Sequence, residues 1–487
     1  MSRYAEAHAN PQGPGDARPT ALQIVKDTEM EGKLAGKSAV ITGVSSGIGL
    51  ETVRAIAATG AFLYLTARDL NKAKTALDDI FKPEQMELIH MDQSSLESVR
   101  NAAKTILSKT DKVSLLINNA GIMALPELRL SMDGYELQFA TNHLSHFLLF
   151  NLLKPAMLAA STPEFQSRVV NVSSDSHRHH GINASDNYNF QKGGYEPWTA
   201  YSQSKTAVIY MANELDRRYG SRGLHATSVH PGMIATNLGQ YLTPEQIEQL
   251  LQNTRWNSLW KSFEQGAATT VWAAVGREWE GNGGKFLAGC AEAVRGPEGT
   301  EDYVGTFVNH TYKPEDEARL WKDSLEMQIL IMVYFKKGTT SDDTRIIVRN
   351  RVYPDRSAIL KLYSFVRNWG SDKKYPTFSY SSWKRALKSQ CGFSSWSHRV
   401  RCKLPLGKGT QEIVYVSCEQ QFAAAIDAMS QSGADLEFEI VHKYKWFRVE
   451  KDPSLNGHRS HGASSKRGSS FYGAAEKLGD FEKCDLD

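Results

Sequence analysis

The sequence predicts an α/β fold, a Rossmann-type doubly wound parallel sheet of about seven strands, followed by a small C-terminal α+β module. Two observations predict the doubly wound sheet. Short runs rich in Val, Ile and Leu alternate with longer segments of helical period, as in parallel sheets buried on both faces. A glycine-rich turn also separates the first such run from the first helical segment, which is typical of dinucleotide-binding folds.

The strands of this sheet are expected where the short apolar runs occur, at residues 38–42, 62–67, 86–91, 113–118, 167–173, 225–230 and 284–287. Helices are expected between them, over about 47–59, 70–81, 94–108, 133–160 and 200–219. Together these elements form one dinucleotide-binding domain, residues 36–328.

The rest of the chain divides into three parts. Residues 1–35 are polar and rich in Gly, Pro and Ala, which predicts a flexible N-terminal arm. Residues 451–487 are rich in Ser, Gly and charge, which predicts a disordered tail. Between them, residues 329–450 predict a basic α+β module with strands near 331–335, 345–349, 412–416 and 436–441 and a helix over 420–430.

Composition excludes several classes of protein. Of 487 residues, 41% are apolar and 10% aromatic, so the chain is not disordered throughout. No short period recurs, which excludes collagen, coiled coils and repeat arrays. Five cysteines without CxxC spacing favour a reducing compartment, and no apolar stretch approaches the roughly 18 residues of a membrane span. We therefore expect a soluble, cytoplasmic protein.

The glycine turn runs from Thr42 to Gly49. Gly43 would permit the tight turn, Gly47 would let the backbone approach a pyrophosphate, and Gly49 would let the helix pack on the strand. The second strand ends in Ala67 and Arg68, and a basic residue there favours a 2′-phosphate, hence NADP over NAD. Asp69 could oppose this by binding a ribose hydroxyl, or could cap the next helix instead.

Tyr201 and Lys205 form the candidate catalytic pair. They lie four residues apart in a helical segment, so both side chains share one face. A neighbouring cation lowers the pKa of a phenol from its ordinary value near ~10, which would make Tyr201 a usable acid and base. A solvated helix face could carry the same two residues by chance.

Five motifs in order resemble the short-chain dehydrogenase/reductase superfamily: TGVSSGIG (42–49), NNAG (118–121), VVNVSS (169–174), YSQSK (201–205) and HPG (230–232). The segments TNHLSHFLL (141–149), SSDSHR (173–178), VHPGMIATNL (229–238) and QGAATTVWAA (265–274) are similar to its retinol dehydrogenase and WW-domain oxidoreductase branch. The resemblance runs from about residue 20 to 328, and we expect neither WW domains nor a membrane anchor, since residues 1–35 contain no Trp and no long apolar stretch.

This resemblance implies an NADP-dependent alcohol dehydrogenase or carbonyl reductase. It assigns Ser174 to the substrate oxygen, Tyr201 to proton transfer, Lys205 to the nicotinamide ribose, and Asn142 to a water relay. Asn142, Tyr201 and Lys205 would also contact the cofactor. The other implied cofactor residues are Gly43, Ser45, Gly47, Ile48, Gly49, Arg68, Asp92, Asn119, Ala120, Gly121, Pro231, Gly232 and Thr236. Apolar residues at 251–263 would form a substrate lid, which suggests a lipophilic substrate.

Several alternatives remain open. The chain could be an NADP(H)-sensing scaffold whose C-terminal module, which faintly resembles a ubiquitin-like interaction domain, binds an acidic protein. Residues 361–408 hold eleven Lys or Arg against one acid, so nucleic-acid binding is a second alternative, although no binding motif supports it. We expect no metal site, because no carboxylate or cysteine near His177, His179 and His180 of the HRHH run completes a ligand set. A homodimer is possible.

Overall fold

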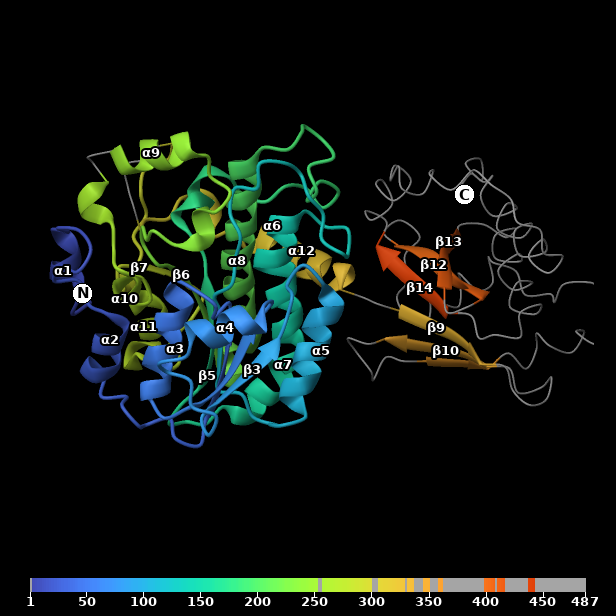
Figure 1. Cartoon of the computed structure of the whole chain (residues 1–487), viewed down its shortest axis with the longest axis horizontal. Helices are drawn as coiled ribbons and strands as arrows, with labels where there is room; N and C mark the ends of the chain where they lie inside the picture. Colours follow the sequence, from blue (N-terminus) through green and yellow to red (C-terminus); the bar gives the residue numbers. More distant parts are fainter. Residues whose placement is uncertain are drawn as a thin grey trace, which may run out of the picture. The chain divides into compact units, whose positions relative to one another are not determined.

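The structure is a computed structural model (Figure 1). It describes residues 2–252, 256–299 and 305–328, and beyond them 331–336, 345–350, 358–361, 398–407, 410–416 and 437–442. The chain divides into two compact units, Met1–Ser324 and Leu325–Asp487.

The first unit contains a mostly parallel sheet of eight strands in the order β3-β2-β1-β4-β5-β6-β7-β8. The strands are β1 (Ser38–Thr42), β2 (Phe62–Ala67), β3 (Met86–His90), β4 (Leu115–Asn118), β5 (Ser167–Val172), β6 (Leu224–His230), β7 (Lys285–Ala288) and β8 (Ala291–Glu292). Strands β1 to β7 are parallel and the short β8 pairs antiparallel with β7. The order reverses between β1 and β4, which confirms the predicted doubly wound topology.

Helices cover both faces of this sheet (Figure 1). One layer contains α3 (Ile48–Ala58) and α11 (Ala268–Val275), and the other contains α5 (Leu96–Leu107), α7 (Ser145–Ala160) and α8 (Pro197–Tyr219). Besides two helices near the N-terminus, described below, this part of the chain also contains α4 (Leu70–Ala76), α6 (Leu137–Phe139), α9 (Pro244–Gln252), α10 (Phe263–Gly266) and α12 (Pro314–Met327). Of the helices that the structure describes, none combines the length and apolar character that crossing a bilayer requires.

Three helices differ from their predicted bounds. Helix α4 ends at Ala76 rather than near residue 81. Helix α8 begins at Pro197 because the Glu196 carboxylate accepts the backbone N–H groups of residues 198 and 199 and so caps it. The segment 133–160 is interrupted by a π-helical turn, η1 (Ala140–Leu144), between α6 and α7. A π-helical turn holds one residue more than an α-helical turn, and the periodicity of the sequence does not reveal that insertion.

The predicted flexible arm over residues 1–35 is corrected by the structure. The segment forms α1 (Ala5–Ala9) and α2 (Ala21–Asp27), and α2 packs against α3 and α11. Ala21, Ile24 and Val25 lie on one face of α2 and are at most 1% exposed. Average composition hid this face, because the apolar residues occupy only the i, i+3 and i+4 positions of one short helix.

Arg18 fastens this N-terminal segment to a distant loop. Its guanidinium is 4% exposed and pairs with the Asp16 carboxylate, with 2.8 Å between Nε and Oδ1. The same group donates to the backbone carbonyls of Gly13, Ser258, Leu259 and Trp260. One buried cation thus holds the backbone of residues 258–260 in place.

The second unit contains a six-stranded antiparallel sheet in the order β11-β10-β9-β14-β12-β13. Its strands are β9 (Ile331–Lys336), β10 (Arg345–Asn350), β11 (Ala358–Lys361), β12 (His398–Gly407), β13 (Thr410–Val416) and β14 (Glu437–His442). Strands β9, β10, β13 and β14 lie where the sequence predicts strands. The predicted helix 420–430, most of the basic segment 361–408 and the tail 451–487 lie outside the described residues.

We predict that Arg18→Ala lowers the free energy of unfolding by about 2–4 kcal/mol, because it removes the charged partner of the half-buried Asp16 carboxylate and the donor to several backbone carbonyls. Urea unfolding followed by fluorescence measures this change. Arg3→Ala is the control, since Arg3 is an exposed arginine of the same segment, and should stay within about 0.5 kcal/mol. Equal effects of the two variants would contradict the role assigned to Arg18.

Candidate active site

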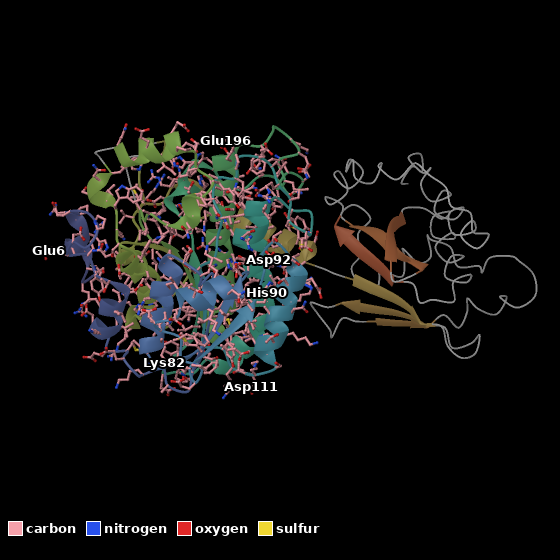
Figure 2. All side chains as sticks on the ribbon, in the orientation of Figure 1. Glu6, Lys82, His90, Asp92, Asp111 and Glu196 are labelled. Carbon is pink, nitrogen blue, oxygen red and sulfur yellow. The ribbon has the colours of Figure 1, made fainter. Side chains whose placement is uncertain are left out.

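A cleft of about 1950 Å³ lies at the carboxyl edge of the parallel sheet. Loops that follow β1, β2, β3, β4, β5 and β6 all contribute to its lining. Figure 2 shows the polarity of the sheet: Asp92, which follows β3, lies well away from Lys82 and Asp111, which precede β3 and β4. The crevice outside the carboxyl ends of such strands is where doubly wound folds bind ligands.

The glycine turn forms one wall of this cleft, and its close packing requires glycine. Gly43 has φ of +73°, and a Cβ there would lie 2.7 Å from the Ala120 Cα. A Cβ on Gly49 would lie 2.2 Å from the carbonyl oxygen of Gly43. The amino end of α3 therefore rests directly on the end of β1, and Ser45, Gly47 and Ile48 line the cleft there. Such a helix start is suited to bind phosphate.

Tyr201 and Lys205 lie one turn apart on α8, as the sequence predicts, and both line the cleft. They are only 2% and 3% exposed. The Lys205 ammonium lies 5.7 Å from the centre of the Tyr201 ring and donates to the Val172 carbonyl at 2.9 Å. The pair is thus held in the wall between β5 and α8.

Burial governs the pKa of both groups. It raises the pKa of the Tyr201 phenol to about 12, and a hydrogen bond with Ser174 opposes this rise. It lowers the pKa of the Lys205 ammonium to about 7. The direction for Tyr201 is opposite to the expected one, because the same burial that affects the phenol also disfavours the cation beside it.

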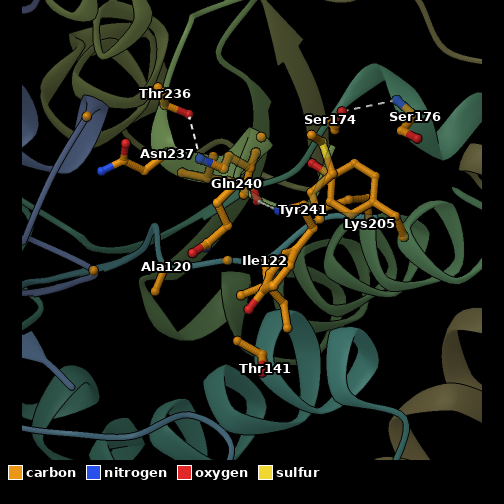
Figure 3. A pocket seen from close by; sticks show the side chains of 18 of the residues that line it. Ala120, Ile122, Thr141, Ser174, Ser176, Lys205, Thr236, Asn237, Gln240 and Tyr241 are labelled. Carbon is orange, nitrogen blue, oxygen red and sulfur yellow. Dashed lines mark hydrogen bonds between the residues drawn. The ribbon is translucent and has the colours of Figure 1, made fainter. Parts of the chain in front are cut away.

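Ser174 and the preceding Ser173 are oriented differently. The Ser174 hydroxyl caps the 3₁₀ turn η2 (Asp175–His179) by accepting the Ser176 N–H at 3.1 Å. Figure 3 shows this bond at the side of the pocket where Lys205 also lies, with Thr236 and Asn237 on the other side. The Ser173 hydroxyl instead donates to the Lys205 carbonyl at 2.9 Å. Only Ser174 of these two interacts with the Tyr201 phenol.

Among the described residues, Asn142 lies just behind the lining of the cleft, and its expected part in a water relay stays a prediction. It is 1% exposed. Its Oδ1 accepts the Ile122 N–H at 2.9 Å, and its Nδ2 donates to the Ile122 carbonyl at 3.0 Å and to the Ser204 hydroxyl at 2.8 Å. The side chain is therefore committed to holding the backbone of Ile122, which does line the cleft.

The other predicted residues all border the cleft: Gly43, Ser45, Gly47, Ile48, Gly49, Arg68, Asp92, Asn119, Ala120, Gly121, Pro231, Gly232 and Thr236. Their order along the cleft follows the strand order. Arg68 and Asp92 follow β2 and β3 at one end, and Pro231 to Thr236 follow β6 at the other.

The sequence prediction missed the apolar rim of the cleft. Met132, Ile247 and Trp198 are 79%, 42% and 37% exposed, and all three line it. Trp198 also packs edge-to-face against the Tyr201 ring, at 6.2 Å between ring centres. Its i, i+3 spacing from Tyr201 is a signal that could have located it. Trp256 and Trp260, from the predicted lid, line the cleft as well.

The sheet is doubly wound, a glycine turn lies at its carboxyl edge, and a buried Tyr–Lys pair lies in the same cleft. These features define a Rossmann-type oxidoreductase. Comparison with known proteins agrees: the family model described as short chain dehydrogenase matches residues 37–247. The chain belongs to the short-chain dehydrogenase/reductase family, whose members are NAD(P)-dependent oxidoreductases.

Three curated relatives illustrate the range of this similarity. Short-chain dehydrogenase/reductase prx1 of Penicillium roqueforti is 50% identical over 325 residues, covering 67% of this chain and 94% of the relative. Oxidoreductase calI of Penicillium decumbens is 43% identical, covering 67% and 97%. Retinol dehydrogenase 13 of Homo sapiens is 34% identical, covering 60% and 85%.

We predict that Lys205→Met stabilises the fold in a pH-dependent way. Folding lowers the pKa of Lys205 from 10.5 to about 7, so below pH 7 the wild type buries a charged ammonium, and above pH 10.5 the group is neutral in both states. The gain from Met should be on the order of 1–3 kcal/mol at pH 6 and should shrink as the pH rises toward 10.

Urea unfolding of both proteins at pH 6 and pH 9 measures this difference. Lys104→Met, on the surface of α5, is the matched control and should show no such trend. A gain from Lys205→Met that is constant with pH would contradict the assigned pKa.

Proposed function

We propose that the protein catalyses hydride transfer between NADP(H) and a lipophilic alcohol or carbonyl compound. The observation that carries this proposal is the convergence of Ser174, Tyr201 and Lys205 beside an apolar rim in one cleft. A sensor that binds the cofactor without chemistry does not need a buried phenol beside a buried amine, and that burial carries a cost in stability.

The residues present fit a bound dinucleotide. The close backbone packing at Gly43 and Gly49 leaves the turn open to a pyrophosphate at the amino end of α3. When bound, the nicotinamide supplies or accepts the hydride. The chain's own contribution is then to orient the substrate oxygen and to move one proton.

Ser174 and Tyr201 would donate hydrogen bonds to the substrate oxygen, where negative charge grows during reduction. Tyr201 gives its proton to that oxygen in reduction and takes it back in oxidation. Lys205 lies close enough to the Tyr201 ring to favour the phenolate while its ammonium is charged. Oxidation therefore benefits from any interaction that keeps Lys205 protonated, such as hydrogen bonds to the cofactor ribose.

Preference for NADP is supported by the residues after β2. The Asp69 carboxylate accepts the Lys72 N–H at 2.9 Å and so caps α4, which supports a capping role for this residue. Arg68 and Lys72 are exposed side chains lining the same end of the cleft. Two cations there suit a 2′-phosphate, whereas a carboxylate free to bind the ribose hydroxyls would suit NAD.

A lipophilic substrate is supported by the exposed apolar side chains of Met132, Trp198 and Ile247 at the mouth. Large apolar groups gather at a cleft where they contact an apolar ligand. The relationship to retinol dehydrogenase 13 is compatible with this class of substrate, without fixing a retinoid.

We predict that Tyr201→Phe retains NADPH binding and loses turnover by a factor on the order of 10² or more, because it removes the proton donor and little else. A panel of aldehydes and ketones of graded chain length, assayed with NADPH, measures kcat/KM, which should rise with chain length in the wild type. Tyr210→Phe is the control: Tyr210 is a buried tyrosine of the same helix that hydrogen-bonds the His310 carbonyl outside the cleft. Near wild-type turnover in Tyr201→Phe would refute the proposal.

We predict that Arg68→Ala raises the KM for NADPH about 10- to 100-fold and leaves the KM for NADH within about twofold, since it removes one charged hydrogen bond to the 2′-phosphate. Steady-state kinetics with both cofactors measures the ratio. Lys74→Ala, an exposed lysine of α4 that does not line the cleft, controls for the change in net charge. Parallel changes for NADPH and NADH would overturn the assignment of Arg68.

A further inference from the structure

His146 joins parts of the site that are far apart in the sequence. It lies in the first turn of α7, is 2% exposed, and does not line the cleft. Its Nδ1 lies 2.9 Å from the Asn142 carbonyl oxygen. Its Nε2 lies 2.9 Å from the Thr42 hydroxyl and 3.1 Å from Nε2 of Gln93.

These contacts define which nitrogen carries the proton. The Asn142 carbonyl can only accept, so Nδ1 carries the hydrogen and donates it. Nε2 then accepts from the Gln93 amide and from the Thr42 hydroxyl. Thr42 has its proton available for this bond, because its oxygen already accepts the N–H groups of Asn119 and Ala120 at 3.0 Å each.

The uncharged ring is also the form that its surroundings favour. Burial lowers the pKa of His146 to about 4, and the positive charge of nearby Lys205 acts in the same direction. At neutral pH the imidazole therefore has one donor and one acceptor, and the network above uses both.

The Nε2 side of the ring reaches the cofactor end of the cleft. Thr42 is the first residue of the glycine turn, and Gln93 follows Asp92 after β3. Asn119 and Ala120, which bind the same Thr42 hydroxyl, follow β4. Gln93, Asn119 and Ala120 line the cleft themselves. One acceptor nitrogen thus ties three loops to one another.

The Nδ1 side reaches the π-helical turn η1. In this turn the Ser145 N–H bonds the Ala140 carbonyl five residues back instead of four. The Ser145 hydroxyl donates to the Thr141 carbonyl at 2.7 Å, and the His146 ring donates to the next one, that of Asn142. Both side chains thus donate to backbone carbonyls of η1. The same turn carries Asn142, whose side-chain amide holds the backbone of Ile122.

The segment held by Asn142 lies beside Lys205. A Cβ on Gly121 would lie 3.2 Å from the Asn142 Oδ1 and 3.5 Å from the Lys205 Nζ. Ile122 and Lys205 both line the pocket in Figure 3. A shift of Asn142 would therefore move the backbone that borders the proton-transferring pair.

We propose that His146 is a positioning residue that holds the three cofactor-side loops and the Asn142 turn in one arrangement, through an acceptor on one ring nitrogen and a donor on the other. This inference rests on the proposed function. The two ring nitrogens then have separate effects: the acceptor Nε2 governs cofactor binding, and the donor Nδ1 governs the chemical step.

Two conservative variants test this separation. In His146→Gln the side-chain amide reaches the former position of Nε2, which keeps an acceptor for Thr42 and Gln93 and loses the donor to Asn142. In His146→Asn the amide stays at the former position of Nδ1, which keeps the donor and loses the acceptor. His146→Phe removes both.

We predict that His146→Gln keeps the NADPH Kd within about threefold and lowers kcat about 10-fold or more, because a small misplacement of the reacting groups slows the chemical step strongly. His146→Asn should show the reverse, with Kd raised about 10-fold and kcat at saturating cofactor within about threefold. His146→Phe should lose both. Cofactor fluorescence titration measures Kd, and steady-state kinetics measures kcat.

His143→Phe is the matched control. His143 is the residue after Asn142 in η1, is 1% exposed, and its ring bonds the Ser324 hydroxyl at 2.7 Å, away from the cleft. It should lose thermal stability while Kd and kcat stay within about twofold.

Kd and kcat changing in the same proportion in His146→Gln and His146→Asn would overturn the proposal, whether or not His146→Phe folds. So would a His146→Phe variant with wild-type kcat and Kd. A wild type that binds NADPH but turns over no alcohol or carbonyl would instead refute the proposed function, and the predicted difference in Kd between the two conservative variants would still test the acceptor side.

Discussion

The carboxyl edge of the sheet depends on a contact between backbones that excludes side chains. Gly49 meets the Gly43 carbonyl, and Gly43 meets Ala120, at distances too short for a Cβ. These contacts bring the start of α3, the end of β1 and the loop after β4 together at one point. The Thr42 hydroxyl can then accept two N–H groups of that loop. Two of the loops that line the cleft, those after β1 and β4, are thus held together at this junction.

The site also concentrates ionisable groups where water is excluded. Burial raises the pKa of Tyr201 to about 12 and lowers that of Lys205 to about 7, and it raises the pKa of Asp175, next to Ser174, to about 7. Each shift opposes ionisation. The shifts of Lys205 and Asp175 carry a cost in stability at neutral pH, because both groups are charged there in the unfolded chain, whereas Tyr201 is neutral in both states at that pH. A fold can bury such groups only when the free energy gained from the surrounding packing exceeds that cost. Interactions gained when a ligand binds can lower it, which links stability of this region to occupancy of the cleft.

The sequence predicted the sheet because continuous apolar runs are visible without knowledge of tertiary contacts. The glycine turn and the Tyr201–Lys205 pair were predictable for the same reason, since each is a local pattern. The orientation of the Asn142 side chain toward Ile122 was not predictable, because it depends on the π-helical turn, which no local periodicity reveals. The fastening of the N-terminal segment by Arg18 was missed because its partners lie some 240 residues away.

That fastening bears on how the mouth of the cleft can bind an apolar molecule. The backbone of residues 258–260 is fixed by Arg18, while the Gln265 side chain donates to the backbone of Asp16 and Arg18. The rim residues Met132 and Ile247 are exposed instead. Removing such apolar surface from water contributes roughly 25 cal/mol per Å², so covering it favours binding. The side of the mouth formed by residues 258–260 thus has a fixed backbone that determines its shape, whereas covering the exposed side with a ligand contributes free energy of binding. Under the proposed function, affinity for a lipophilic substrate and discrimination among such substrates would then arise from different residues.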